Sequence, residues 1–293
     1  MKLLDIYNVF EECINKWAEK GFDNRIEEAF DKFEGWIQNY DEEEKQIISE
    51  LIEKFDYYSE NNIVEIIKEL CDLAIKELGI SNDNSVVSVI RKPNGILNSS
   101  YEYWMLHQFY SGLSKKIYYD SLDNIADEIW GNISNIVFID DCSGTGEQFV
   151  KFLKRQNKDF SGKRIYFFVI EIMEEAQNVI EKYAHEENIE IVIIPHKVKE
   201  KALKNSDDIV KNKFTDMSRK QKIPDVSILG FKEAEALMAF HNNTPNDTLG
   251  IFWYSTDKND PIFIREKAEE PGWKKIKNDK KERSRQRYET KVR

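Results

Sequence analysis

The N-terminal part of the chain has the hydrophobic spacing of amphipathic helices. Apolar residues recur every three or four positions, as at Ile6, Phe10 and Ile14, so that they share one face of a helix. Polar breaks divide this part into about four helices, and they fall near residues 21–23, 39–41 and 59–62. Asp41 is followed three residues later by Glu44, which is the spacing of a capping box at a helix start. We therefore predict an all-helical subdomain over residues 1–80.

From residue 82 onward, apolar runs typical of strands alternate with helical segments. The predicted strands cover residues 85–90, 116–119, 135–139, 164–170 and 189–194, and the helices between them cover 99–109, 121–133, 147–155 and 174–185. Most of these strands are apolar along their whole length, as expected when helices cover both faces of a parallel sheet. The pattern predicts an α/β fold with a parallel sheet, preceded by the helical subdomain.

Three further segments complete the predicted organisation. Residues 197–222 are rich in Lys and Asp and predict a long exposed helix or an excursion from the fold. A helix over residues 233–240 and a last strand over residues 249–254 follow. The α/β domain accordingly spans residues 81–273, and residues 274–293 form a basic tail.

The composition describes a globular protein that we expect in the cytoplasm. The 293 residues are 41% hydrophobic and 33% charged, enough to bury a core and divide into one or two domains. No stretch approaches the roughly 18 uncharged apolar residues of a membrane span, and residues 1–20 lack the apolar block of a signal peptide, so no membrane partner is expected. Cys13, Cys71 and Cys142 are odd in number and far apart, which disfavours a disulfide framework or a structural zinc site.

Charge is distributed unevenly along the chain. The formal net charge is −11, yet residues 1–80 carry 21 acids against 9 bases and residues 274–293 carry 10 bases against 3 acids. The acidic helices predict either a solvated outer face or a surface for a protein partner. The tail offers several Lys and Arg residues that can neutralise phosphates, so nucleic acid is a further candidate partner, beside the plain alternative of a solvated tail.

Residues 136–149 carry the clearest chemical signal. An apolar strand ends in Asp140 and Asp141, and a turn of small residues then opens into a helix. Glycines let successive amide N–H groups converge, and the positive end of the following helix completes a cradle for phosphate. The cradle consists of Cys142, Ser143, Gly144, Thr145 and Gly146. Because the acid pair beside it is suited to accept hydrogen bonds from ribose hydroxyls, the pattern predicts a sugar-phosphate site.

Other phosphate-binding patterns fit these residues poorly. A Walker A loop requires Lys after its last glycine, where this chain has Glu147. The dinucleotide pattern has a third glycine and no acid pair before the turn. The remaining alternative is a plain strand-to-helix turn with solvated acids, which the complete register of strand, acids, glycine turn and helix disfavours.

The motif resembles the signature of the type I phosphoribosyltransferases, which is an apolar strand, two acids, three small or apolar residues, Thr-Gly and a helix. Asp140 and Asp141 match the acids, and Thr145 and Gly146 match the Thr-Gly. Gln148 stands where the family usually has a small hydroxyl residue. The resemblance implies a phosphoribosyltransferase-like core, catalytic roles for the two acids, and 5-phosphoribosyl 1-pyrophosphate with magnesium as the donor. No metal ligand is assigned directly.

A larger part of the chain, about residues 15–265, resembles the PRTase-CE proteins of bacterial conflict and anti-phage systems. In those proteins a helical region precedes the transferase-like core. The resemblance rests on the loop motif, on the helical start with Trp36 and residues 55–58, and on a C-terminal run at residues 243–253. It implies an enzyme or toxin effector that modifies a base, a nucleotide or a nucleic acid.

Two further sets of residues are candidates for the remaining parts of such a site. Arg91 and Lys92 follow the first strand of the core, where the family binds pyrophosphate, although a basic surface turn explains them equally well. Asn246, Trp253 and Arg265 are candidates to contact the acceptor, with core packing as the alternative for Trp253. The four histidines have no metal-ligand spacing.

Two classes of function remain open from the sequence. The first is a magnesium-dependent phosphoribosyltransferase-like enzyme. The second is a non-catalytic nucleotide or sugar-phosphate sensor that regulates a partner protein through the helical region. Release of pyrophosphate separates the two, because only the enzyme turns its donor over.

Overall fold

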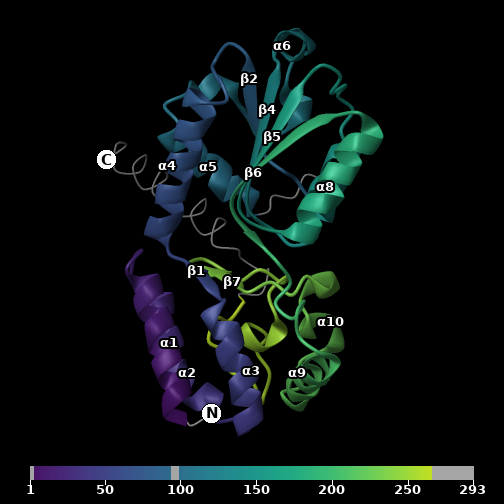
Figure 1. Ribbon diagram of the computed structural model, residues 1–293. Coiled ribbons are helices and arrows are strands. Elements are labelled where there is room, and N and C mark those ends of the chain that lie inside the picture. The colour runs from purple at the N-terminus through teal and green to yellow at the C-terminus, as the bar shows by residue number, and fades with distance from the viewer. Residues whose placement is uncertain (1–2, 94–98, 266–293) are drawn as a thin grey trace, which may run out of the picture.

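A five-stranded parallel sheet occupies the upper half of the molecule in Figure 1. The computed structural model describes residues 3–93 and 99–265, and the predicted tail at 274–293 lies outside the described residues. The strands, in the order β3-β2-β4-β5-β6, are β2 (Ser85–Ser88), β3 (Tyr118–Tyr119), β4 (Asn135–Ser143), β5 (Arg164–Met173) and β6 (Glu190–Lys199). The α/β fold class predicted from the sequence is confirmed.

Helices cover both faces of this sheet. Successive residues of each strand point to opposite sides, so apolar side chains on both faces are buried under helices. The covering helices are α4 (Glu60–Lys76), α5 (Ser100–Tyr110), α7 (Glu147–Lys154) and α8 (Glu174–Glu187). Phe138 of β4 and Phe167 of β5 pack against Phe149 of α7, with ring centroids 5.6 and 4.2 Å away. Phe168, the next residue of β5, instead lies 6.3 Å from the ring of His107 on α5. The apolar strands of the sequence are thus buried on both sides.

The N-terminal helices share a second core with the C-terminal part of the chain, in the lower half of Figure 1. The helices of this half are α1 (Leu3–Ala18), α2 (Asn24–Ile37), α3 (Glu42–Glu53), α9 (Asp208–Lys220) and α10 (Asp225–Ile228). The ring of Trp36 lies 5.8 Å from that of Phe252, and Phe55 stacks on Phe263 at 5.1 Å. The first two predicted breaks between the N-terminal helices are confirmed, as is the capping box at the start of α3, whereas the third break lies earlier than predicted because α4 already begins at Glu60.

A short strand follows α3 that the hydrophobic spacing did not predict. β1 (Asp56–Tyr58) pairs in parallel with β7 (Met238–Phe240), and together they form a separate two-stranded sheet. The helix predicted over residues 233–240 is therefore wrong. Its apolar run is too short to distinguish a helix from a buried strand, and pairing with β1 decides the outcome.

The strand predicted over residues 249–254 is also wrong, because this segment forms the 3-10 helix η5 (Gly250–Phe252). A Cβ on Gly250 would lie 2.4 Å from the carbonyl oxygen of Ser227, so the backbone here packs directly against α10. Two other predictions are corrected in extent. Residues 121–133 form only η3 (Leu122–Asn124) and α6 (Asp127–Asn132), and in residues 197–222 the end of β6 precedes α9.

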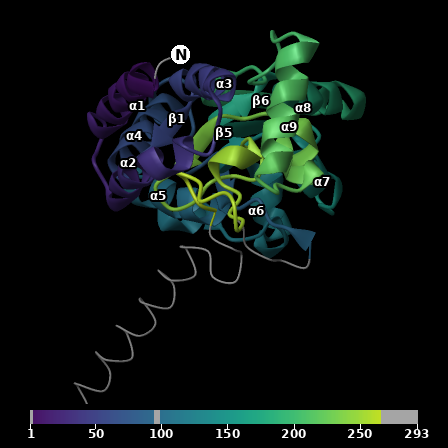
Figure 2. The same ribbon diagram turned by 90° about the horizontal axis from the view of Figure 1, so that it is seen from below.

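The order of the strands creates a switch point between β2 and β4. From β2 the chain moves outward to β3, then returns to β4 on the other side of β2 and continues outward through β5 and β6. In open parallel sheets, ligands bind at the carboxyl ends of the strands where the order reverses in this way. Seen from below, the C-terminal segment lies between the N-terminal helices and α9 (Figure 2).

Arg25 of α2 holds that C-terminal segment in place. Its guanidinium donates hydrogen bonds of 2.6 Å to the carbonyl oxygens of Phe240 and Ile264 and to the hydroxyl of Thr244. Phe240 precedes residues 242–247 and Thr244 lies within them, so an N-terminal helix fixes this loop from the C-terminal part of the chain. No helix in the described ranges is both long and apolar enough to cross a membrane.

We expect the Arg25→Ala variant to lose about 2–4 kcal/mol of unfolding free energy, because two carbonyl groups and a hydroxyl lose a charged donor. Urea denaturation measures the loss. Arg219→Ala is the control, since Arg219 lies exposed in ion pairs with Asp216 and Asp225 and should change stability by less than about 0.5 kcal/mol. Equal effects of the two variants would contradict the role given to Arg25.

Candidate functional site

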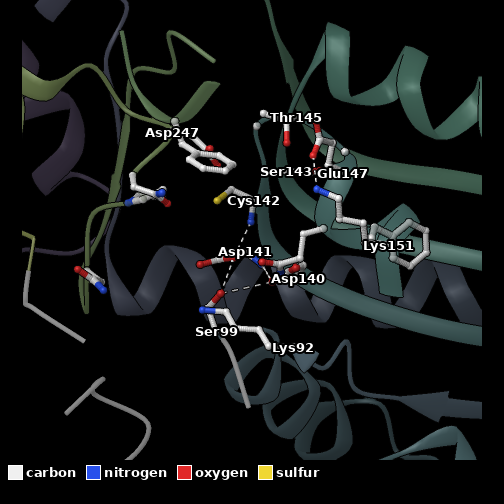
Figure 3. A pocket seen from close by; sticks show the side chains of 18 of the residues that line it. Lys92, Ser99, Asp140, Asp141, Cys142, Ser143, Thr145, Glu147, Lys151 and Asp247 are labelled. Atoms are coloured by element: carbon white, nitrogen blue, oxygen red, sulfur yellow. Dashed lines mark hydrogen bonds and ion pairs between the residues drawn. The ribbon is translucent and has the colours of Figure 1, made fainter. Parts of the chain in front are cut away.

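A pocket of about 500 Å³ lies at the switch point of the sheet. Its walls come from the end of β4 and the following turn, the start of α7, residues 92–93 after β2, and residues 242–247 with Arg265. Figure 3 shows these side chains converging from elements far apart in the sequence. The pocket therefore combines the predicted phosphate turn with the C-terminal run that the sequence related to the acceptor.

The acid pair lies within β4, which extends to Ser143 and thus further than predicted. Asp140 is almost fully buried, and burial together with the charge of Asp141 raises its pKa well above the ordinary value. The hydroxyl of Ser99, at the start of α5, donates to Asp141 at 2.9 Å and lies 3.5 Å from Asp140 (Figure 3). The pair is fixed in direction, and hydroxyl groups of a ligand can donate to its remaining oxygens.

Only part of the segment predicted as the phosphate turn forms a turn, because its first residues belong to a strand. Cys142 and Ser143 belong to β4, and the Cys142 amide already donates to Asp141 at 2.8 Å. The turn proper is Gly144 to Gly146, and Gly146 is the N-cap of α7 with a left-handed φ of 71°. Gly146 has no side chain to cap the helix, and no side-chain cap bond is found at this end of α7, unlike α3 or α9. The first amides of α7 are therefore open to an anion.

Cys142 is not placed to act as a nucleophile. Burial raises the pKa of its thiol well above the ordinary value, and the neighbouring acids Asp141, Asp247 and Asp140 raise it further. The thiol thus stays protonated near neutral pH. Cys142 is therefore a small, unreactive residue near the end of β4.

The two basic candidates after β2 lie in different surroundings. Lys92 lines the pocket, whereas Arg91 forms an ion pair with Asp120 at 3.0 Å and is not among the lining residues. Further along the pocket, Glu147 is ion-paired with Lys151 at 2.5 Å and with Lys232. Of the predicted pyrophosphate residues, the structure brings Lys92 to the acid pair and turn.

The three acceptor candidates are also separated by the structure. Asn246 and Arg265 line the pocket. Trp253 is buried behind them, where its indole N–H donates to the carbonyl oxygen of Thr248 at 2.7 Å and its ring lies 5.7 Å from the Arg265 guanidinium. Trp253 supports Arg265 from the core and does not reach the pocket, so its alternative of core packing describes its position.

Asp247 is an acidic pocket residue that sequence reasoning missed. Burial and the charge of Asp141 raise its pKa to about 6. Its carboxylate adjoins the turn so closely that a Cβ on Gly144 would lie 2.3 Å from its Cγ. The only signal in the sequence was its position beside Asn246 in a loop rich in Asn. Nothing local relates it to a turn about one hundred residues earlier.

Glu171 lies beneath the acid pair, where β5 pairs with β4 opposite Cys142. Its side chain is fully buried and accepts a hydrogen bond of 2.7 Å from the hydroxyl of Tyr58, while its second oxygen has no hydrogen-bond partner in the described part of the chain. Burial, partly offset by Lys199, raises the pKa of Glu171 to about 7. The core next to the end of β4 therefore holds a buried carboxyl that titrates near neutral pH.

The acid pair of this pocket has the donor groups to hold magnesium together with the phosphates of a ligand. No group of three or more His, Cys, Asp or Glu side chains within residues 3–93 and 99–265 is placed to hold a metal ion. Magnesium is commonly bound by one or two carboxylates together with substrate phosphates and water. The acid pair satisfies that donor chemistry, since a nearby cation offsets the burial and the charge of Asp141 that raise the pKa of Asp140.

A parallel sheet with an acid pair and a glycine turn at its switch point defines a phosphoribosyltransferase-like domain. Residues 33–265, most of the chain, match the model of the family described as PRTase-CE. The chain belongs to the PRTase-CE family. No curated protein matches it.

We expect the Gly146→Ala variant to unfold more easily by at least about 1–2 kcal/mol, the cost of a side chain in the left-handed region. The added Cβ would also lie 2.6 Å from the carbonyl oxygen of Ala176. The control is Gly35→Ala within α2, where nothing lies within 4 Å of the new Cβ and helix propensity should stabilise the protein by up to about 1 kcal/mol. Denaturation midpoints that shift in the same direction for both variants would contradict the strained position given to Gly146.

Glu171 gives the protein a specific dependence of stability on pH. Its folded-state pKa of about 7 lies above the ordinary value of 4.5, so the native state keeps a proton that the unfolded state releases between these values. The contribution of this group to stability therefore falls as the pH rises from about 4.5 to 7, by on the order of 3 kcal/mol. Glu171→Gln removes that loss.

The measurement is the unfolding free energy of both proteins at pH 5 and pH 7.5. We expect the variant to gain stability relative to the wild type on going to pH 7.5. A difference between the two proteins that is the same at both pH values would show that Glu171 does not titrate in this range.

Proposed function

We propose that this protein is a phosphoribosyltransferase that uses 5-phosphoribosyl 1-pyrophosphate to modify a base, a nucleotide or a nucleic acid. The observation that carries the proposal is the combination, in one pocket, of a fixed acid pair with an uncapped helix start. Membership of the PRTase-CE family supports it. We also propose that the protein acts in the cytoplasm as an effector in bacterial anti-phage defence.

The donor would lie across the switch point. Asp140 and Asp141 accept hydrogen bonds from the ribose hydroxyls, and the amides from Gly144 to the start of α7 bind the 5'-phosphate. Lys92 is placed to attract the pyrophosphate. Arg91 helps to position the residues that directly follow β2 through its ion pair with Asp120. Magnesium, when bound with the donor, supplies positive charge to the pyrophosphate oxygens.

The acids of the pocket suit the charge that develops in such a transfer. The bond between the ribose C1' and the pyrophosphate oxygen breaks, and pyrophosphate leaves with the electron pair. The ring then carries positive charge, as in glycoside hydrolysis, until the acceptor forms the new bond to C1'. Asp140 and Asp141, held by Ser99, stabilise that charge without moving.

The acceptor would enter along the wall of the pocket that residues 242–247 and Arg265 form. Asn246 offers an amide that donates and accepts, and Arg265 is a rigid donor whose guanidinium is fixed by the carbonyl oxygen of Thr244 at 2.8 Å. Such groups suit the polar edge of a base. Binding of nucleic acid by residues 274–293, and of a protein partner by the acidic helices, stay predictions.

Calorimetric titration with 5-phosphoribosyl 1-pyrophosphate and magnesium tests the proposal. We expect the wild type to bind, and the Asp140→Asn/Asp141→Asn double variant to bind about 10–100-fold more weakly, because hydrogen bonds to charged acceptors are lost. Asp216→Asn, an exposed acid on α9, is the control and should bind as the wild type does.

The same proteins are then assayed for pyrophosphate release with a panel of nucleobases, nucleotides and nucleic acids. Release by the wild type and not by the double variant is the expected result. Absence of magnesium-dependent binding would overturn the proposal. Binding with no release across the panel would favour the alternative function, a sensor that regulates a partner protein.

A further inference from the structure

The carboxylate of Asp247 lies against the turn that the proposed function assigns to the 5'-phosphate. The space that a Cβ of Gly144 would occupy is filled by Asp247 Cγ, Oδ2 and Cβ at 2.3–2.7 Å, and the nearby Gly144 amide partly offsets the rise in pKa that burial gives this carboxylate. Figure 3 shows Asp247 facing Cys142 and Thr145 across the turn. The turn therefore already carries, in the space beside Gly144, an acidic side chain that belongs to the chain itself.

Asp247 is held in this place by its backbone. A Cβ on Gly230 would lie 2.0 Å from the carbonyl oxygen of Asp247, and the same oxygen accepts a hydrogen bond of 3.0 Å from the amide of Ala236. The neighbouring residue Asn246 accepts one of 2.7 Å from the amide of Phe231. The contact with Gly144 is thus a built feature of the packing between two segments.

The charge of Asp247 is poorly compensated by its surroundings. Three ionisable groups face it: Asp141 and Cys142 from β4, and Arg265 from the C-terminal segment. Asp141 repels the carboxylate, and Arg265 attracts it but donates its side-chain hydrogen bonds to Thr244 and Asn246. Glu147, the other acid at the turn, differs because Lys151 and Lys232 both pair with it.

We infer that Asp247 is an internal competitor for the anion site and determines which ligands the turn accepts. A phosphate can enter the space beside Gly144 only when the carboxylate moves away, so a ligand must bring enough binding energy from its ribose and pyrophosphate groups to displace it. A small phosphate that lacks those groups is thereby rejected. This inference rests on the proposed function, since it concerns the same turn.

The test measures the affinity of ribose 5-phosphate by calorimetry for the wild type and for Asp247→Asn. The Asn side chain keeps the shape and an acceptor for the Gly144 amide but removes the charge, so we expect affinity to rise about tenfold or more. Inorganic phosphate should follow the same direction. Asp216→Asn is the matched control and should leave both affinities unchanged.

A structure of the wild-type protein with ribose 5-phosphate provides a measurement that does not depend on the variant. We expect the Asp247 carboxylate to have left the space beside Gly144, so that Asp247 Cγ lies farther from Gly144 than in the free protein. An unchanged contact beside a bound phosphate would overturn the inference, as would equal or weaker binding by Asp247→Asn. If neither protein binds ribose 5-phosphate or the full donor, the result contradicts the proposed function itself and not only the role of Asp247.

Discussion

The site depends on the close approach of other segments to the β4–α7 turn. Three glycines allow it: within the turn, Gly144 meets the side chain of Asp247 and Gly146 meets the carbonyl oxygen of Ala176, and outside it Gly230 meets the carbonyl oxygen of Asp247. A side chain at any of these positions would lie within 2.6 Å of an atom of another segment. The turn therefore keeps its shape only while α8 and the C-terminal loop are in place, and it owes that loop to the β1–β7 pair and to Arg25. A change that destabilises the lower half of the molecule therefore also alters the geometry of the pocket.

Electrostatics at the site is set by burial more than by the number of charges. The chain is acidic at its N-terminal end, yet part of that charge is satisfied internally, as where Lys220 of α9 lies 2.6 Å from Glu44. The pocket carries uncompensated carboxyl groups at Asp140 and Asp247, both with raised pKa values, beside helix amides that attract anions. Such a mixture suits a ligand with hydroxyl groups, negative phosphates and a reacting carbon that becomes positive.

Local patterns predicted the elements of the fold, and contacts between distant segments decided the rest. The helices before residue 80, the parallel strands and the acid pair were all readable, because periodicity, capping and the strand–turn–helix register lie within a few residues of one another. The strand β7 was not, because it exists through pairing with β1 almost two hundred residues earlier. For the same reason the sequence could not separate Arg91, held by Asp120, from Lys92 in the pocket, and it missed Asp247.

The most direct test of the proposed donor site is a crystal structure of the protein with 5-phosphoribosyl 1-pyrophosphate and magnesium. We expect the ribose hydroxyls at about 2.5–3.2 Å from Asp140 and Asp141, with the 5'-phosphate on the amides from Gly144 to the start of α7. A donor bound elsewhere on the molecule, or bound here with its phosphate away from that turn, would contradict the proposed site.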